Sequence, residues 1–221
     1  MNTINEYLSL TEFEAIIFGN QKVKISDVVL NRVNESFNFL KEFSGNKVIY
    51  GVNTGFGPMA QYRIKESDQI QLQYNLIRSH SSGTGKPLSP ECAKAAILAR
   101  LNTLSLGNSG VHSSVIHLMA ELINRDITPL IFEHGGVGAS GDLVQLSHLA
   151  LVLIGEGEVF YKGERRPTPE VFEIEGLKAI QVEIREGLAL INGTCNDRNW
   201  SCKCSLCSKI IRLVAKSFLC N

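Results

Sequence analysis

Apolar residues recur in steps of three and four along much of the chain, which is the spacing of amphipathic helices. The pattern is clearest between Ser26, which can cap a helix start, and Gly45, which can end one. The apolar positions of this stripe are Val29, Val33, Phe37, Leu40 and Phe43. Similar periodicity predicts helices over residues 67–80, 90–106, 115–122 and 143–154. The last of these is apolar on nearly every face, so we expect it to be buried.

Short apolar runs without this period predict strands. We expect one strand at Lys47–Tyr50, an extended segment at Ile127–Phe132, and a hairpin that turns at Lys162-Gly163 between Val159–Tyr161 and Arg165-Arg166. The chain is therefore predicted to be mainly α with a few short strands.

Composition narrows the class of protein. A chain of 221 residues, 44% of them hydrophobic, can bury a substantial core. Its 22 basic and 22 acidic residues cancel, which argues against a nucleic-acid or membrane-surface partner. No apolar run approaches the roughly 18 residues of a membrane span, and the first residues lack the basic and apolar regions of a signal peptide. The expected location is the cytoplasm.

The last residues differ from the rest of the chain. Residues 1–194 contain a single cysteine, Cys92, whereas residues 195–221 contain the other five and five basic residues against one acid. The cluster Cys202, Cys204 and Cys207 lacks the paired second half of a typical zinc site. We therefore divide the chain into a domain, residues 1–194, and a Cys-rich tail, residues 195–221.

The most informative stretch is residues 134–143, which read His-Gly-Gly-Val-Gly-Ala-Ser-Gly-Asp-Leu. One interpretation is a plain loop whose glycines permit positive φ angles. A second is dinucleotide binding, because residues 136–141 match G-x-G-x-x-G and Glu158 lies near the expected ribose position. Pro129 in the preceding extended segment weakens this second interpretation.

A third interpretation concerns covalent chemistry of the backbone. In an Ala-Ser-Gly tripeptide, the glycine nitrogen can attack the alanine carbonyl carbon, and two waters leave, one of them from the serine hydroxyl. The product is a five-membered ring with an electrophilic methylidene group. Gly141 leaves the nitrogen accessible, Ala139 is small, and Ser140 supplies the leaving hydroxyl. A helix that begins just after the ring would favour an electron-rich adduct through its positive dipole end.

Four segments together resemble the aromatic amino acid ammonia-lyases, the histidine, tyrosine and phenylalanine lyases that use a methylidene-imidazolone (MIO) group. They are the glycine-rich loop with Ser147-His148 after it, Tyr-Gly-Val-Asn-Thr-Gly-Phe-Gly at 50–57, Arg-Ser-His-Ser-Ser-Gly at 78–83, and Gly-Leu-Ala-Leu-Ile-Asn-Gly-Thr at 187–194. One departure is Gln145, where the family usually has proline. Four motifs in order favour the family over the dinucleotide interpretation. The resemblance implies the N-terminal part of the aspartase/fumarase-like ammonia-lyase fold.

The resemblance also implies roles for individual residues. Ala139, Ser140 and Gly141 would form the MIO group without any metal. Tyr50 would be the base that removes a proton from the substrate β-carbon, although alone it could equally be a core tyrosine. Asn192 would hold the substrate amino-acid group near the ring, although Asn-Gly is also a common turn.

His80 aligns with the family position that helps to select the substrate ring. A histidine there can hydrogen-bond a phenol or an imidazole, so tyrosine and histidine both stay open as substrates, and we favour tyrosine, which would give 4-coumarate. Histidine would give urocanate, and an aminomutase outcome on the same fold is a further alternative. The other histidines show no metal-ligand spacing, and we expect structural roles for His112, His117, His134 and His148.

In the family, Asn-Gly-Thr leads into a helical half that supplies further site residues and builds a homotetramer. Nothing after Thr194 resembles that half. Residues 195–204 can be back-translated so that a shifted frame reads Val-Met-Thr-Gly-Ile-Gly-Val-Val-Asn, an apolar helix of the expected kind. We therefore hypothesise that the tail is a frameshift product and the chain a truncated lyase whose site is incomplete on its own. An inactive remnant or a metal-binding module is the alternative from another class.

Overall fold

The computed structural model describes residues 2–6, 8–45, 47–137 and 143–193. The helices of these ranges are α1 (Leu10–Ile17), α2 (Asp27–Ser44), η1 (a 3-10 helix, Gly57–Gln61), α3 (Glu66–His80), α4 (Pro90–Leu104), α5 (Ser113–Asn124), α6 (Leu143–Leu153), α7 (Thr168–Glu175) and α8 (Glu186–Ile191). The strands are β1 (Asn2–Ile4), β2 (Val23–Ile25), β3 (Thr84–Pro87), β4 (Thr128–Pro129), β5 (Phe132–His134), β6 (Glu158–Tyr161) and β7 (Glu164–Pro167). The prediction of a mainly α chain with a few short strands is confirmed.

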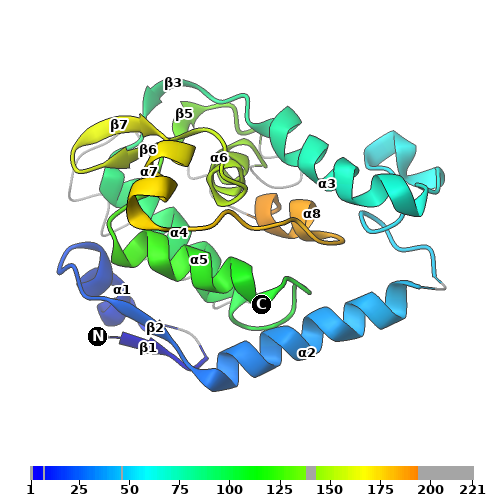
Figure 1. The fold of residues 1–221 in the computed structure, drawn as a ribbon, viewed down its shortest axis with the longest axis horizontal. Helices are drawn as coiled ribbons and strands as arrows, with labels where there is room; N and C mark the ends of the chain where they lie inside the picture. Colours follow the sequence, from blue (N-terminus) through cyan, green and yellow to red (C-terminus); the bar gives the residue numbers. More distant parts are fainter. Residues whose placement is uncertain (1, 7, 46, 138–142, 194–221) are drawn as a thin grey trace.

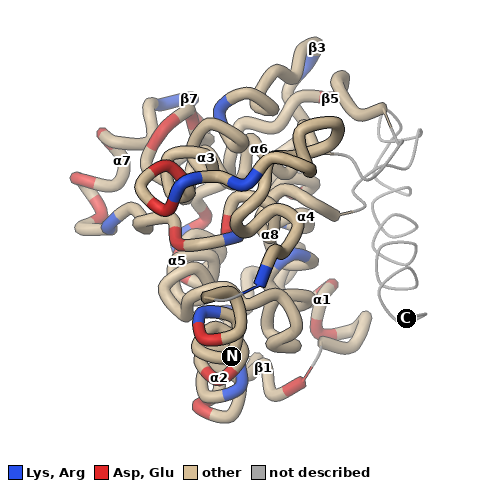
Figure 2. Tube along the Cα trace, turned by 90° about the vertical axis from the view of Figure 1, so that its right-hand side faces the viewer, with Lys and Arg blue, Asp and Glu red and all other residues tan. Residues whose placement is uncertain are grey.

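Helix α6 lies in the middle of the fold, with α3, α5 and α8 packed around it (Figure 1). Its sequence contains no Asp, Glu, Lys or Arg, whereas the outer helix α2 carries both signs of charge and α7 carries acidic residues (Figure 2). Leu146, Leu149, Ala150 and Leu153 are almost fully buried. The expectation of a buried helix over residues 143–154 is therefore confirmed. Among the described helices, none is long and apolar enough to cross a membrane.

Serine caps begin two of the predicted helices as expected. The Ser26 hydroxyl accepts the N–H of Val29 at the start of α2, and the Ser89 hydroxyl accepts the N–H of Cys92 at the start of α4, each at 3.4 Å. Each bond satisfies one of the N–H groups that a helix start leaves without an intrahelical partner. Helix α4 packs against α5 to form the main core.

The strands form three small sheets rather than one large sheet. β1 pairs with β2 in parallel, β3 pairs antiparallel with β5, and β4, β6 and β7 form an antiparallel sheet. The β6–β7 hairpin is confirmed, and its turn places Lys162 and Gly163 at positive φ, as a two-residue hairpin requires. The strand before the glycine-rich loop, β5, pairs with β3, and β6 belongs to another sheet. A dinucleotide-binding βαβ unit needs parallel strands there, so that interpretation is wrong.

The strand predicted at Lys47–Tyr50 is absent: these residues are irregular, and a turn begins at Tyr50. The side chain of Asn53 forms hydrogen bonds with backbone groups that would otherwise be available to a neighbouring strand. Its Oδ1 accepts the N–H of Ile49 at 2.8 Å, and its Nδ2 donates to the carbonyl of Lys47 at 2.5 Å. An asparagine side chain that bonds nearby backbone in this way competes with strand pairing.

Several predicted boundaries differ from the structure. Helix α3 begins at Glu66 rather than at Ser67, because the Ser67 hydroxyl bonds to the neighbouring Asp68 instead of capping the helix. Helix α4 ends at Leu104, and a turn carries the chain to Gly107 at φ +73°. The extended segment 127–132 divides, because β4 and β5 belong to different sheets.

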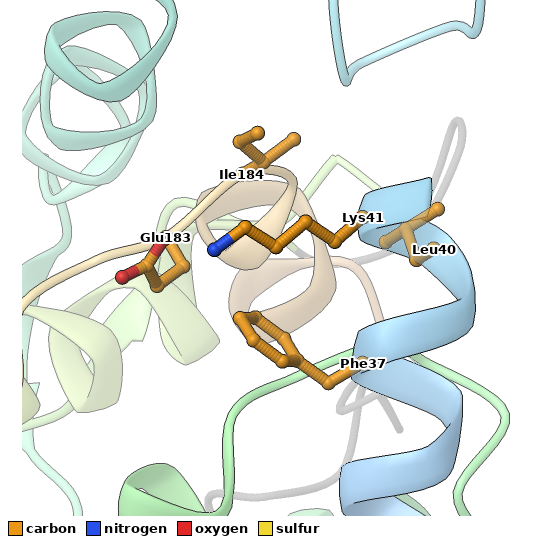
Figure 3. Close-up of a pocket in the computed structure, with 5 residues that line it drawn as sticks. All are labelled: Phe37, Leu40, Lys41, Glu183 and Ile184. Carbon is orange, nitrogen blue, oxygen red and sulfur yellow. The ribbon is translucent and has the colours of Figure 1, made fainter. Parts of the chain in front are cut away.

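The apolar stripe of α2 is buried only along its first half. Val29 and Val33 are buried, whereas Phe43 is 40% exposed. Near its end, α2 meets the segment before α8, where Phe37, Leu40 and Lys41 approach Glu183 and Ile184 (Figure 3). The cavity between them measures about 10 Å³, which is room for at most one water.

Candidate functional site

Helix α6 begins at Leu143, two residues after the last residue of the Ala-Ser-Gly tripeptide. Residues Ala139, Ser140 and Gly141 lie outside the described residues. A helix start presents N–H groups without intrahelical partners and the positive end of the helix dipole. An MIO group at this place would meet an environment that stabilises electron density, so the described residues next to the tripeptide fit the group.

The turn after His80 is docked on α6. The N–H of Gly83 donates to Nε2 of His148 at 3.1 Å. A Cβ on Gly83 would lie 2.7 Å from that nitrogen and 3.2 Å from Cβ of Phe132, so only glycine permits this approach. Beside it, Gly135 has φ +132° and leaves no room for a Cβ against Val144 in the first turn of α6.

His80, which ends α3, is half-buried and oriented by its own helix. Its Nδ1 lies 2.9 Å from the carbonyl oxygen of Leu76. A carbonyl only accepts, so Nδ1 carries a proton and donates. In the neutral ring, Nε2 is then left as an acceptor, which is the group that can bind a phenol O–H or an imidazole N–H.

Asn192 follows the last turn of α8, and its side chain is exposed. Arg100 on α4, which is 6% exposed, donates from Nη2 to the carbonyl of Ala189 in that turn. A Cβ on Gly193 would lie 2.8 Å from Leu146 on α6 and 3.2 Å from Nη1 of Arg100. The Asn-Gly pair therefore lets the chain pass between α4 and α6, which places Asn192 beside the buried helix.

Tyr50 lies in the loop 47–56, which packs on α8. A Cβ on Gly51, at φ +71°, would lie 2.6 Å from Cδ2 of Leu188 on α8. The Tyr50 ring is 53% exposed and sits edge-on to Phe56, and its hydroxyl oxygen accepts the N–H of Gly57 at 3.1 Å. The phenol is therefore held at the surface of the loop rather than in the core.

The segments that carry the three candidate residues therefore all pack on α6 or on a neighbour of α6. The His80 turn contacts α6 directly, the Asn192 turn contacts it through Gly193, and the Tyr50 loop reaches it through α8. Among the described residues, no hydrogen bond links Tyr50, His80 and Asn192 to one another. Their common location stays a prediction.

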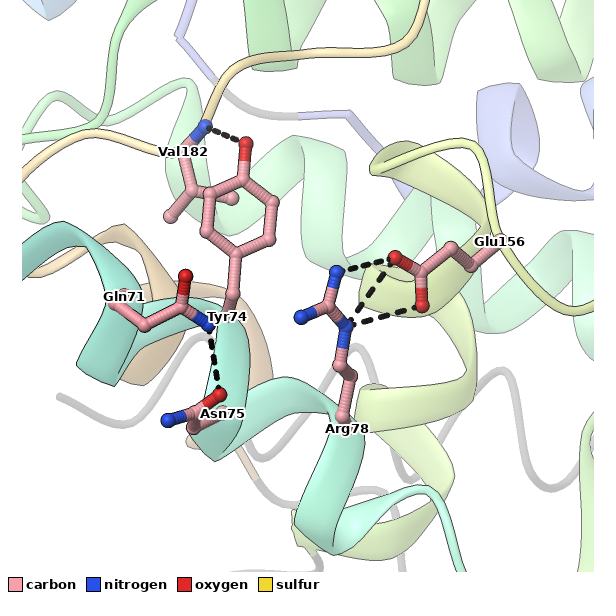
Figure 4. Close-up of polar contacts among 6 residues, drawn as sticks. All are labelled: Gln71, Tyr74, Asn75, Arg78, Glu156 and Val182. Carbon is pink, nitrogen blue, oxygen red and sulfur yellow. Dashed lines mark hydrogen bonds and ion pairs between the residues drawn. The ribbon is translucent and has the colours of Figure 1, made fainter.

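Polar contacts fasten α3 to the elements on either side of α6. Arg78 forms a two-pronged ion pair with Glu156, the shortest distance being 2.6 Å, and the Tyr74 hydroxyl accepts the N–H of Val182 at 3.1 Å (Figure 4). Both charged side chains are about half exposed, so the ion pair adds at most about 1 kcal/mol to stability. The ion pair matters mainly for position, because it holds in place the helix that ends at His80.

Glu186 is a buried acid that the sequence did not single out. One carboxylate oxygen accepts the N–H of His112 at 2.6 Å and the other accepts the N–H of Glu183 at 2.7 Å. These bonds tie the start of α8 to the loop before α5. Burial raises the pKa of Glu186 to about 7, although the two backbone hydrogen bonds act in the opposite direction.

This raised pKa predicts a pH-dependent stability. In the unfolded chain the carboxyl has its ordinary pKa of 4.5, so burying the charged form is penalised in full above about pH 7 and not at all below about pH 4.5. The Glu186 contribution to the free energy of unfolding should fall by about 3 kcal/mol as pH rises through this window. Urea unfolding should therefore show Glu186→Gln gaining stability relative to the parent as pH rises. Glu173→Gln on exposed α7 is the control, and a difference that stays constant with pH would refute the assignment.

The large open cavity beside the first turn of α3 is not part of this arrangement. It measures about 430 Å³ and contains neither Tyr50, His80 nor Asn192. Its lining residues are Arg63, Ile64, Lys65, Asp68, Gln71, Leu72 and Asn75. Within the described ranges, no three His, Cys, Asp or Glu residues are grouped as metal ligands would be. The Cys-rich tail lies outside those ranges.

Comparison with known proteins identifies the family. The model of the aromatic amino acid lyase family matches residues 8–204. Histidine ammonia-lyase of Stigmatella aurantiaca is 43% identical over 195 residues, covering 88% of this chain and 38% of that protein. Histidine ammonia-lyase of Geobacillus sp. (strain WCH70) is 45% identical over 188 residues, covering 85% of this chain and 37% of that protein. The chain belongs to the aromatic amino acid lyase family.

Solved structures agree with this assignment. Tyrosine aminomutase from Streptomyces globisporus is 36% identical with a TM-score of 0.80, covering 87% of this chain and 36% of that one. Histidine ammonia-lyase from Trypanosoma cruzi is 32% identical with a TM-score of 0.78, covering 88% and 38%. The expected ammonia-lyase fold is confirmed. The chain spans well under half the length of these relatives, and the named histidine lyases do not support the expected preference for tyrosine.

Proposed function

We propose that the chain carries the N-terminal part of an ammonia-lyase active site, which acts on an aromatic L-amino acid through an MIO group formed from Ala139, Ser140 and Gly141. The observation that supports this most is the start of α6. The helix begins two residues after the tripeptide, and the turn that follows His80 is hydrogen-bonded to the same helix. The family assignment supports the reaction class.

When formed, the MIO group supplies an electrophilic carbon that makes the substrate amino group a better leaving group. The remaining work belongs to side chains of this chain. Tyr50 would accept a proton from the substrate β-carbon, and its hydroxyl oxygen already receives one hydrogen bond, from Gly57. Asn192 would hold the amino-acid group of the substrate near α6.

His80 would select the substrate ring. Its Nε2 is free to accept a hydrogen bond, because Nδ1 is engaged with Leu76 of its own helix. An acceptor at this place suits the N–H of an imidazole as well as the O–H of a phenol, and a phenylalanine ring offers neither. Since the reported curated relatives are histidine ammonia-lyases, histidine is the first substrate to test and tyrosine the second.

An aminomutase is the second candidate function. Tyrosine aminomutase from Streptomyces globisporus shares the fold at 36% identity. The two outcomes differ only in whether ammonia is returned to the β-carbon, so the described residues suit both. Chromatography of the products separates an unsaturated acid from a β-amino acid.

The activity test needs the part of the relatives that this chain does not match. We define the fusion protein as residues 1–193 continued by the corresponding remainder of the Geobacillus histidine ammonia-lyase. Incubated with L-histidine, L-tyrosine or L-phenylalanine, it should release ammonia and form the unsaturated acid from histidine or tyrosine, and far less from phenylalanine. The remainder alone is the control. A folded fusion protein that releases no ammonia from any of the three would contradict the proposed function.

A further inference from the structure

His148 is a buried histidine to which the proposed reaction assigns no role. It lies in the second turn of α6, six residues after the last residue of the glycine-rich loop, Asp142, and is 9% exposed. Its only hydrogen-bond contact among the described residues joins Nε2 to the N–H of Gly83, 65 residues earlier in the sequence. The backbone N–H can only donate, so Nε2 must accept, and the proton of the neutral ring is on Nδ1.

The surroundings of His148 fix the plane of its ring. Phe132 on β5 packs edge-on against it, with ring centres 5.2 Å apart and planes at 66°. Gly83 approaches so closely that a Cβ there would meet Nε2, Phe132 and the carbonyl oxygen of His134. The packing of Phe132 and the absence of a side chain at Gly83 therefore both allow the hydrogen bond between Gly83 and His148 to form.

We propose that His148 is a positioning residue that holds the Ser81–Gly83 turn, and through it His80, at a fixed place relative to the start of α6. This inference rests on the proposed function, because His80 and the ring-forming tripeptide are the two groups whose separation it sets. His80 ends α3 three residues before Gly83, so a shift of the turn would also move His80, which is proposed to select the substrate ring. The bond requires a neutral ring, since a protonated Nε2 would face the N–H of Gly83 donor to donor.

The surroundings favour that neutral ring. Burial lowers the pKa of His148, and no charged group contributes to the shift. The titratable side chains on these elements have other surroundings. His80 contacts its own helix, and His134 lies 3.3 Å from Glu133. Arg78 on α3 pairs with Glu156, Glu186 on α8 accepts two backbone N–H groups, and His117 on α5 is exposed. Helix α6 itself carries no Asp, Glu, Lys or Arg.

The test is hydrogen exchange of the Gly83 amide in the full chain, followed by NMR. In the parent at neutral pH this amide should exchange more slowly than in His148→Leu, by about fivefold or more, which is the effect of one hydrogen bond. His148→Gln should restore protection, because a glutamine amide oxygen can reach the place of Nε2. The ring-proton signal of His80 should move in His148→Leu and return in His148→Gln. His117→Gln, at an exposed position of α5, is the matched control.

A second measurement needs no substitution. Gly83 protection in the parent should be lost as the ring signals of His148 show its protonation on acidification. Equal exchange of Gly83 in the parent and His148→Leu, or protection that persists through the titration of His148, would overturn the proposal. The mass of the tripeptide region, measured on the same samples, reports separately on the proposed function. An unchanged mass would count against MIO formation in this chain and leave the His148 result standing.

Discussion

Replacing Ser140 with alanine is expected to abolish ammonia release by the fusion protein. Alanine has no hydroxyl to lose as water, so the methylidene carbon cannot form, and no other side chain supplies an electrophile of this kind. The expected drop in kcat/KM is at least ~10³-fold, or about 4 kcal/mol of transition-state stabilisation. Initial rates of ammonia release with histidine and tyrosine measure it.

Ser147→Ala is the matched control for this change. Ser147 is buried in α6, and its hydroxyl donates to the carbonyl of Val144 at 2.7 Å, so its loss perturbs the same helix without touching the tripeptide. This variant should retain most of the activity. If Ser140→Ala kept parental rates, the electrophile would have to come from elsewhere and the proposed mechanism would be wrong.

Replacing Tyr50 with phenylalanine is the second large effect that we expect. The substitution removes the proton acceptor and keeps the edge-on contact with Phe56, so kcat should fall about 10² to 10⁴-fold, the usual contribution of a general base. KM should change little, because the phenol is not assigned to substrate binding. Steady-state kinetics of the fusion protein separates the two parameters.

The control for Tyr50 lies in the same part of the chain. Tyr62 is also 53% exposed, and its phenol has no assigned role, so Tyr62→Phe should leave kcat unchanged. Equal losses in the two variants would mean that the loop is merely perturbed, and Tyr50 would not be the base.

Local patterns predicted the helices well because the signals are local. The stripe from Val29 to Phe43 and the all-apolar run of α6 repeat every three to four residues, and serine caps mark the starts of α2 and α4. The same reasoning failed at Lys47–Tyr50. There the side chain of Asn53 forms hydrogen bonds with the backbone of Ile49 and Lys47, which an apolar run alone does not predict.

The supports of the candidate site could not be predicted from the sequence. The bond from Gly83 to His148 joins residues 65 positions apart, and His148 looked only like a structural histidine. Charged residues normally lie at the surface, yet Arg100 and Glu186 are both buried. Glu186 begins α8, and Arg100 on α4 bonds to the last turn of α8. The sequence offers one signal that could have indicated such a role, a charged residue within an apolar helical run, as at Arg100 between Ala99 and Leu101.

The most direct test of the account is the mass of the peptide that contains residues 138–142, isolated from active fusion protein. The account predicts a mass lower than the encoded one by two water molecules, with fragmentation placing the whole loss within Ala139, Ser140 and Gly141. An active preparation whose peptide has the full encoded mass would contradict it.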